Sequence, residues 1–281
     1  MGTKRSFSYI LTFSIVALMA LAGCTKVSFG LDIAPRFITE SLDDYFDMDS
    51  KSKSQMRGVI QKEIKKLYEC CFKSAFAELE KEITSLKGDA PPELVQKVIG
   101  IYDKNKPAVM DQVKPDIETF INGLSDTQLK YFEREMADNI RKDEKEIKER
   151  DGNWHKSVDR FGKNFAFFCV GLENGEVKKS EEFLSDNQFP YEARLKVKKD
   201  MLAQVTAARV EKKKELLMEY SMGQGFDRAA YSAAAQKYRK DLIGFVFYIY
   251  NGLSEERQAK CRENFKNKVE EFRVYFEETK K

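Results

Sequence analysis

Apolar residues recur along most of the chain at steps of three and four, the spacing of one helix face. The longest such run begins at Met56 and predicts a helix of about 30 residues that ends before Gly88. No segment alternates convincingly like a strand. The pattern predicts an all-α fold, an elongated bundle of about seven to nine amphipathic helices. The inward positions of the first long helix are Ile60, Ile64, Leu67, Cys71, Ala75, Leu79, Ile83 and Leu86.

Other segments carry the same period. We expect helices over about 125–150 and 191–222, the latter broken by Gly223 to Gly225, and an aromatic helix around 161–172 that stops near Gly175. Two more helices follow, with stripes at 231–249 and 261–276. Segment 91–122 is also helical, but Pro107 and Pro115 each remove an amide donor, so we expect two or three shorter pieces there.

One pattern recurs at three places, LSDTQ (124–128), LSDNQ (184–188) and LSEERQ (253–258). In the first, Ser125 can cap the amide of Gln128 while the Gln128 side chain reaches back, which is a capping box. Ser254 has the corresponding place in the third. We interpret all three as helix starts, with imperfect copies in the second and third. Their unequal spacing argues against a solenoid repeat.

The N-terminus has the form of an exported protein. Lys4 and Arg5 precede an apolar stretch at about 9–21, which is shorter than the ~20 residues of a membrane span. Residues 21–24 (LAGC) resemble the lipobox of bacterial lipoproteins, in which the cysteine, here Cys24, is acylated. We expect a signal peptide at 1–23, a lipidated tether at 24–34 and one helical domain at 35–281, with 35–150 and 153–281 as candidate sub-bundles. Thr25, rather than aspartate, favours the outer membrane.

Charge excludes one class of partner. Without Lys4 and Arg5, the 49 basic residues become 47 against 46 acidic ones, and the two signs are interspersed. A nucleic-acid binder concentrates basic residues on one face. The 42% apolar and 34% charged content suits long amphipathic helices around one core.

Four cysteines remain beside Cys24: Cys70, Cys71, Cys169 and Cys261. The favoured interpretation is buried reduced thiols. The alternative is one disulfide joining Cys70 or Cys71 to Cys169 or Cys261, as an oxidising compartment would allow. A bond between Cys70 and Cys71 is disfavoured, because it distorts the peptide between them. No CxxC and one histidine argue against a metal site.

The stretch SLDDYFDMDSKSKSQ (41–55) is the densest acidic cluster. A DDxxD motif can hold magnesium and a diphosphate, but no second acidic motif faces it, and a calcium loop fails at Lys51. We instead expect a hinge between tether and body: Tyr45 and Phe46 on the apolar side of a short helix, Asp49 as N-cap of the next. The remaining carboxylates, directed to solvent or to basic residues, are Asp43, Asp44 and Asp47.

The lipobox, LDDYFD (42–47) with Gln55, and the L-[ST]-x-x-Q helix starts together resemble a domain-of-unknown-function family of bacterial outer-membrane lipoproteins. The family has a Trp-His-Arg stretch in its long helix, where this chain has YECC (68–71). The resemblance implies an outer-membrane location and an all-helical fold, but it implies no activity. The L-[ST]-x-x-Q starts also resemble those of small periplasmic chaperones, although helix capping alone explains that likeness.

We find no catalytic constellation, and His155, the one histidine, has no thiol or carboxylate beside it in the sequence. We therefore expect no enzyme, cofactor, metal, small-molecule substrate or nucleic acid. The favoured function is a periplasmic lipoprotein, bound to the outer membrane through its lipid, that binds or scaffolds an envelope protein. The alternatives are a client-holding chaperone and, more remotely, a DDxxD metal-dependent enzyme.

Overall fold

The computed structural model describes residues 27–149 and 155–278, and this part of the chain is helical without a strand, which confirms the all-α prediction. Helices α4 (Ser50–Leu67) and α5 (Lys73–Thr84) are joined through the π-helix η1 (Tyr68–Phe72) into one rod. With this rod counted as one helix, ten helices pack together in the described ranges. The others are α3 (Val27–Phe46), α6 (Glu93–Asn122), α7 (Asp126–Lys148), α8 (His155–Phe168), α9 (Asn174–Asp186), α10 (Tyr191–Ala207), α11 (Val210–Ser221), α12 (Ala229–Asn251) and α13 (Glu255–Glu278).

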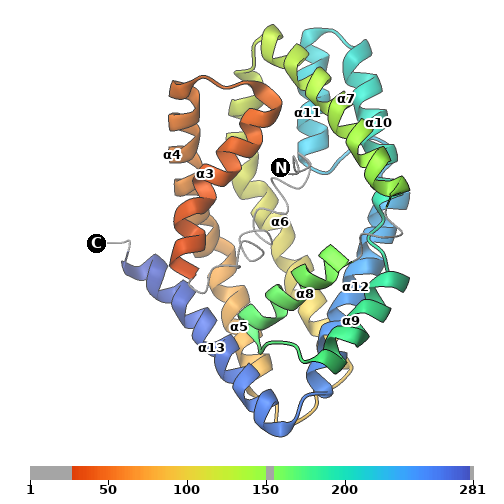
Figure 1. The fold of residues 1–281 in the computed structure, drawn as a ribbon. Coiled ribbons are helices and arrows are strands. Elements are labelled where there is room, and N and C mark those ends of the chain that lie inside the picture. Colours follow the sequence, from red (N-terminus) through yellow and green to blue (C-terminus); the bar gives the residue numbers. More distant parts are fainter. Residues whose placement is uncertain (1–26, 150–154, 279–281) are drawn as a thin grey trace.

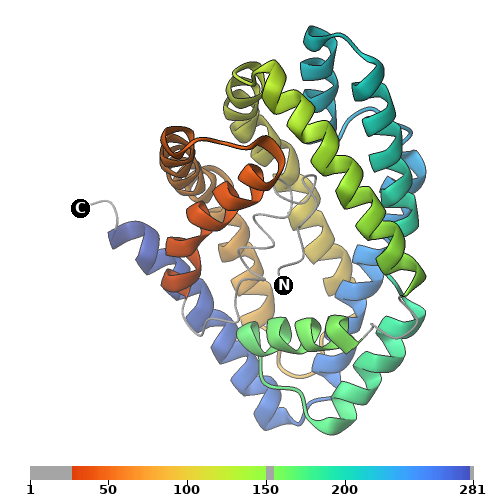
Figure 2. The same ribbon diagram turned by 45° about the horizontal axis from the view of Figure 1, so that its top comes forward.

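The helices are arranged around a ring that does not follow the chain order, and Figures 1 and 2 show it from two directions. Helix α3 packs on α4 and α7, and α7 on α10. At the other end of the chain, α13 returns to α5 and to the beginning of α3. The first and last described helices are therefore in direct contact.

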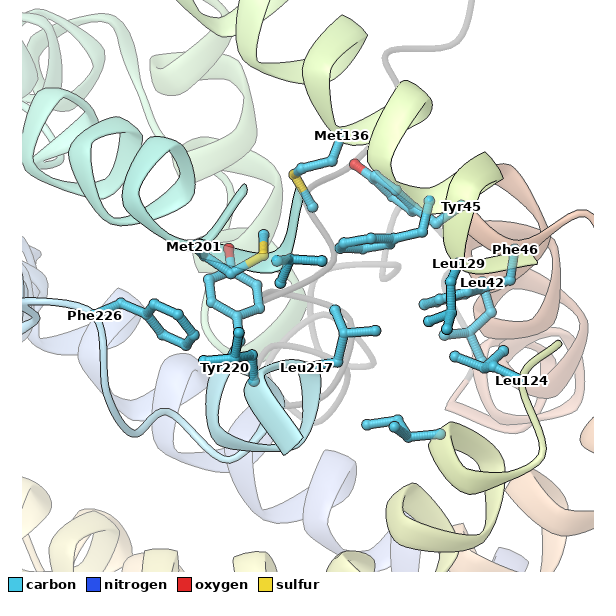
Figure 3. Packing of buried hydrophobic residues seen from close by; sticks show 14 of the residues in the cluster. Leu42, Tyr45, Phe46, Leu124, Leu129, Met136, Met201, Leu217, Tyr220 and Phe226 are labelled. Atoms are coloured by element: carbon cyan, nitrogen blue, oxygen red, sulfur yellow. The ribbon is translucent and has the colours of Figure 1, made fainter. Parts of the chain in front are cut away.

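Buried apolar residues form separate clusters around this ring. The largest joins the end of α3 to α6, α7, α10 and α11. It contains Phe132 together with Tyr45, Phe46 and Met201, which are labelled in Figure 3. A second joins α6, α8, α9, α12 and α13. A third joins the start of α3 to η1, α5, α8 and α13. All three clusters draw residues from both sides of 150–153, so the cores do not divide into the expected sub-bundles 35–150 and 153–281.

Helix α6 runs without interruption through Pro107 and Pro115, so the prediction of two or three pieces is wrong. Both prolines are exposed, whereas Val109 and Ile117, each two residues further on, are buried. The carbonyls that lose a partner at the prolines therefore lie on the outer side, where water can satisfy them. The buried stripe of α6 stays intact.

Two other boundaries differ from the prediction. The expected helix over 191–222 is divided at Ala208 and Arg209, whose backbone is extended, into α10 and α11. Gly223 (φ 72°) and Gly225 (φ 67°) then adopt the left-handed conformation that glycine tolerates, and end α11 as expected. Segment 174–186 forms α9, so LSDNQ ends a helix and does not begin one.

The start of the body also differs. Residues 27–34, which the sequence assigned to a tether, are the first two turns of α3. Val27, Leu31 and Ala34 are buried there, because they lie on the side of the helix that faces α13. The predicted signal peptide (1–23) and Cys24 lie outside the described residues.

Candidate functional site

The acidic stretch forms the turn between α3 and α4. One oxygen of Asp43 accepts a hydrogen bond from the Met48 N–H (2.8 Å), and the other pairs with Lys53 at 2.6 Å. Asp47, at φ 44°, turns the chain after the last residue of α3. The expectation that these carboxylates face solvent or basic residues is met for Asp43, which pairs with Lys53, and for Asp47, which is exposed, whereas Asp44 is half-buried. Asp43 therefore fastens the turn to α4.

The predicted hinge between tether and body is wrong, because α3 is a 20-residue helix that packs on α7 and α13, so the turn joins two helices of the body. The predictions for Asp49, Tyr45 and Phe46 are confirmed. Asp49 is the N-cap of α4 and accepts from the Ser52 N–H at 2.7 Å. That hydrogen bond from Ser52 holds the pKa of Asp49 below its usual value. Tyr45 and Phe46 are buried, and Phe46 stacks on Phe132 with ring centres 5.3 Å apart. In the described residues no group of three or more acidic, cysteine or histidine side chains is placed to hold a metal ion.

The capping predictions for Ser125 and Ser254 are also confirmed. Ser125 accepts from the Gln128 N–H (3.3 Å), and the Gln128 side chain accepts from the Ser125 N–H (3.1 Å). Ser254 accepts from the Arg257 N–H at 3.4 Å. Both serines therefore begin helices, α7 and α13.

Ser125→Ala is expected to lower the free energy of unfolding by about 1 kcal/mol, because the capping box of α7 is lost. Ser185→Ala is the matched control within the same sequence pattern. Ser185 lies in the last turn of α9 and donates to the Glu182 carbonyl, so no N-cap is removed. Urea unfolding of the two variants measures the difference, and equal losses would contradict the capping role.

The cysteines pair in neither of the two ways that the sequence analysis expected. Cys169 and Cys261 form a disulfide, and Cys70 and Cys71 form another within η1. Reduced thiols and a bond between the two pairs were the expected alternatives. The pairs cannot meet because Cys71 packs with Leu67 and Val109, whereas Cys169 and Cys261 belong to the cluster of α8, α12 and α13. The bond between Cys70 and Cys71 lies in η1, where the backbone departs from α-helical geometry.

A buried polar network between α7 and α10 was missed by the sequence analysis. Lys198 is fully buried, and its amine donates to Asn139 (2.7 Å) and pairs with Asp143 (2.5 Å). Arg194 lies 3.7 Å from the same carboxylate. The signal was present in the sequence: Lys198 follows Leu195 by three residues and precedes Leu202 by four, so it stands on the apolar stripe.

Burial lowers the pKa of Lys198 to about 8, and the positive charge of Arg194 acts in the same direction. Asp143 opposes the shift. A buried amine with a lowered pKa can serve as a base or nucleophile. Here, however, its hydrogens are directed at Asn139 and Asp143, which join α10 to α7, so the geometry favours a structural tie.

A shallow groove of about 440 Å³ lies between α9 and α12. Phe183 and Phe245 line it and stack on each other with ring centres 4.1 Å apart. Tyr248 stands at its edge, more than half exposed, with the Lys179 amine 5.3 Å from its ring centre. An exposed tyrosine beside a cation and an aromatic base is typical of protein contact surfaces.

The start of α3 is held against α13. The Val27 N–H donates to Glu271 (3.2 Å), and the Tyr275 hydroxyl donates to Asp32 (2.7 Å). Cys24, the predicted lipid attachment, precedes this junction by three residues.

His155, the one histidine, is the first residue of α8. Within the described ranges, no helix has the length and apolar character needed to cross a bilayer.

Comparison of the chain with protein-family models, with curated proteins and with solved structures finds no match.

Proposed function

We propose that this chain is a lipid-anchored helical protein of the cell envelope, held at the periplasmic face of the outer membrane through Cys24. The observation that carries the proposal is the pairing of the cysteines. Cys169 with Cys261 and Cys70 with Cys71 form disulfides, which persist in oxidising compartments such as the periplasm. Their pairing does not involve Cys24, the residue of the lipobox. Export and acylation therefore account for all five cysteines together.

The resemblance to the lipoprotein family supports the same location. The chain departs from that family at Tyr68 to Cys71, the residues that lie in η1 and carry the vicinal disulfide. Whatever the Trp-His-Arg stretch does in the family, we propose that this chain does not share it.

We further propose that the protein works by contact with an envelope protein rather than by catalysis. The groove between α9 and α12 is the contact surface that we propose, because an exposed tyrosine, a lysine and a stacked aromatic pair line it together. In the acidic turn, Asp43 and Asp49 bind Met48, Lys53 and Ser52 of the chain itself, which supports a structural role there.

Replacing Cys24 by serine tests the anchor. The variant is expected to lose labelling by a palmitate analogue in cells and to leave the membrane fraction, because the acylated thiol is gone. Cys70→Ser is the matched control and is expected to keep the label. Continued labelling of Cys24→Ser would show that the lipoprotein proposal is wrong.

Site-specific photo-crosslinking in cells tests the contact. A photoreactive amino acid at position 248 is expected to give one discrete adduct, and the same residue at Lys145, an exposed position on α7, is expected to give none. A ladder of adducts of many sizes at 248 would instead favour the client-holding chaperone. No adduct at 248 would contradict the groove as the contact surface.

A further inference from the structure

Three large apolar side chains stay exposed in the described residues, and two of them lie on α3 and α13, the helices that meet at the junction. Phe29 (54% exposed) is in the first turn of α3, and Val274 (39% exposed) is on α13. Each is next to the contact that joins these helices, since Val27 binds Glu271 and Tyr275 binds Asp32. We call these two side chains and their surroundings the α3–α13 edge.

Within each helix, the exposed residue lies opposite the buried ones. Val27 and Leu31 face α13, and Phe29 lies about 200° around the helix from Val27. On α13, Phe272 and Phe276 are buried, and Val274 lies between them on the outer side. Neither exposed residue is therefore needed for the junction itself.

The distance from the lipid to this edge is short. Three peptide units separate Cys24 from Val27, so their Cα atoms are at most about 11 Å apart. Phe29 lies about 3 Å further along the helix axis. Val27 and Asp32 are bound to α13, so the start of α3 is held to the rest of the body. An acylated Cys24 would hold the edge beside the headgroup layer of its leaflet.

Charges at the edge are balanced rather than basic. Lys268 pairs with Glu271 at 2.7 Å, and Arg273 pairs with Glu270. A surface that binds anionic lipid by charge would present unbalanced lysine and arginine. Contact with the bilayer would depend on the apolar side chains.

We propose that the α3–α13 edge is a membrane-contacting surface, with Phe29 and Val274 inserted among the headgroups next to the lipidated Cys24. This inference rests on the proposed function, because it requires the acyl anchor. Bilayer contact by phenylalanine and aliphatic side chains is the usual behaviour of interfacial helices. The occupant is the lipid surface itself, and the acyl chains bring it within reach.

Fluorescence of single-tryptophan variants of the acylated full protein tests the proposal. Trp154, the one tryptophan of the chain, is replaced by phenylalanine, and tryptophan is placed at Phe29, Val274 or Tyr248. The proteins are reconstituted into phosphatidylcholine vesicles with and without 30% phosphatidylglycerol, a composition of roughly physiological anionic content. Position 248 is the matched control, since it is comparably exposed but lies on α12, across the fold from the start of α3 (Figure 1).

On vesicles, the tryptophan at 29 is expected to emit at shorter wavelength, to be quenched by brominated lipid, and to show about twofold weaker quenching by acrylamide than in the Cys24→Ser protein. A smaller change is expected at 274 and none at 248, with no dependence on phosphatidylglycerol. Circular dichroism checks that each variant is folded, and the tryptophan at 274 is the second probe if the one at 29 disturbs α3.

If mass spectrometry shows an acylated Cys24 while positions 29 and 274 stay as accessible as 248, the edge proposal is wrong and the anchor stands. If Cys24 carries no lipid, both proposals are wrong. Protection at 29 in native membranes but not in pure vesicles would show that a protein covers the edge, and would also overturn lipid contact.

Discussion

Replacing Cys169 and Cys261 together by alanine is expected to lower the free energy of unfolding by about 4 kcal/mol, the largest effect that we expect from any pair of substitutions. The two residues are 92 positions apart, and their disulfide ties α13 to the end of α8. A crosslink that closes so long a loop removes much of the conformational freedom of the unfolded chain. Urea unfolding of the oxidised protein measures the change.

Two controls separate the crosslink from the packing of the cysteine side chains. In reductant, the wild-type protein and the variant are expected to unfold at similar urea concentrations. The variant is expected to unfold at nearly the same urea concentration with and without reductant. The disulfide between Cys70 and Cys71 joins adjacent residues and closes no long loop, so its reduction adds little through chain entropy. A variant as stable as the oxidised wild type would contradict the assigned role of the long-range bond.

The fold class could be predicted because burial follows helical period. The stripe from Ile60 to Ile83 lies on the rod of α4, η1 and α5, and the Ser125 capping box begins α7 as its local chemistry requires. Local signals of this kind depend on residues within one turn of each other, so a single sequence contains them in full.

The errors arose where the outcome depends on what a residue faces. Pro107 and Pro115 break no helix because their missing donors lie on the outer side of α6. The break at Ala208 and Arg209 has no glycine or proline to announce it. The partners of Cys169 and Lys198 are 92 and 55 or 59 residues away, and no local pattern specifies contacts at that distance.

Lys198→Ala is expected to destabilise the protein by about 3 kcal/mol. The substitution leaves Asn139 and Asp143 without the buried amine, and removes the aliphatic stem that fills the space between α7 and α10. Because Arg194 still lies near Asp143, we expect a loss of stability at the lower end of the range found when one partner of a buried ion pair is removed. Urea unfolding at neutral pH measures the loss.

Lys199→Ala is the matched control one residue away. Lys199 is half exposed and pairs with Glu144 on the surface, so its loss is expected to have little effect. A double-mutant cycle with Asp143→Ala separates the ion pair from packing, because Asp143→Ala should cost less once Lys198 is gone. Strict additivity would show that Lys198 acts through packing alone.

The pH dependence of stability gives an independent measure of the buried charge. Native Lys198 releases its proton near pH 8, whereas the unfolded lysine holds it to about 10.5. Between these values the unfolded state binds more protons, so the free energy of unfolding rises with pH through this window. Tyr238, whose pKa burial raises to about 12, opposes this only above pH 10. Between pH 8 and 10, the free energy of unfolding of Lys198→Met should therefore not show the rise with pH that the wild type shows. The same slope of free energy against pH in both proteins would mean that Lys198 is not buried as a charge.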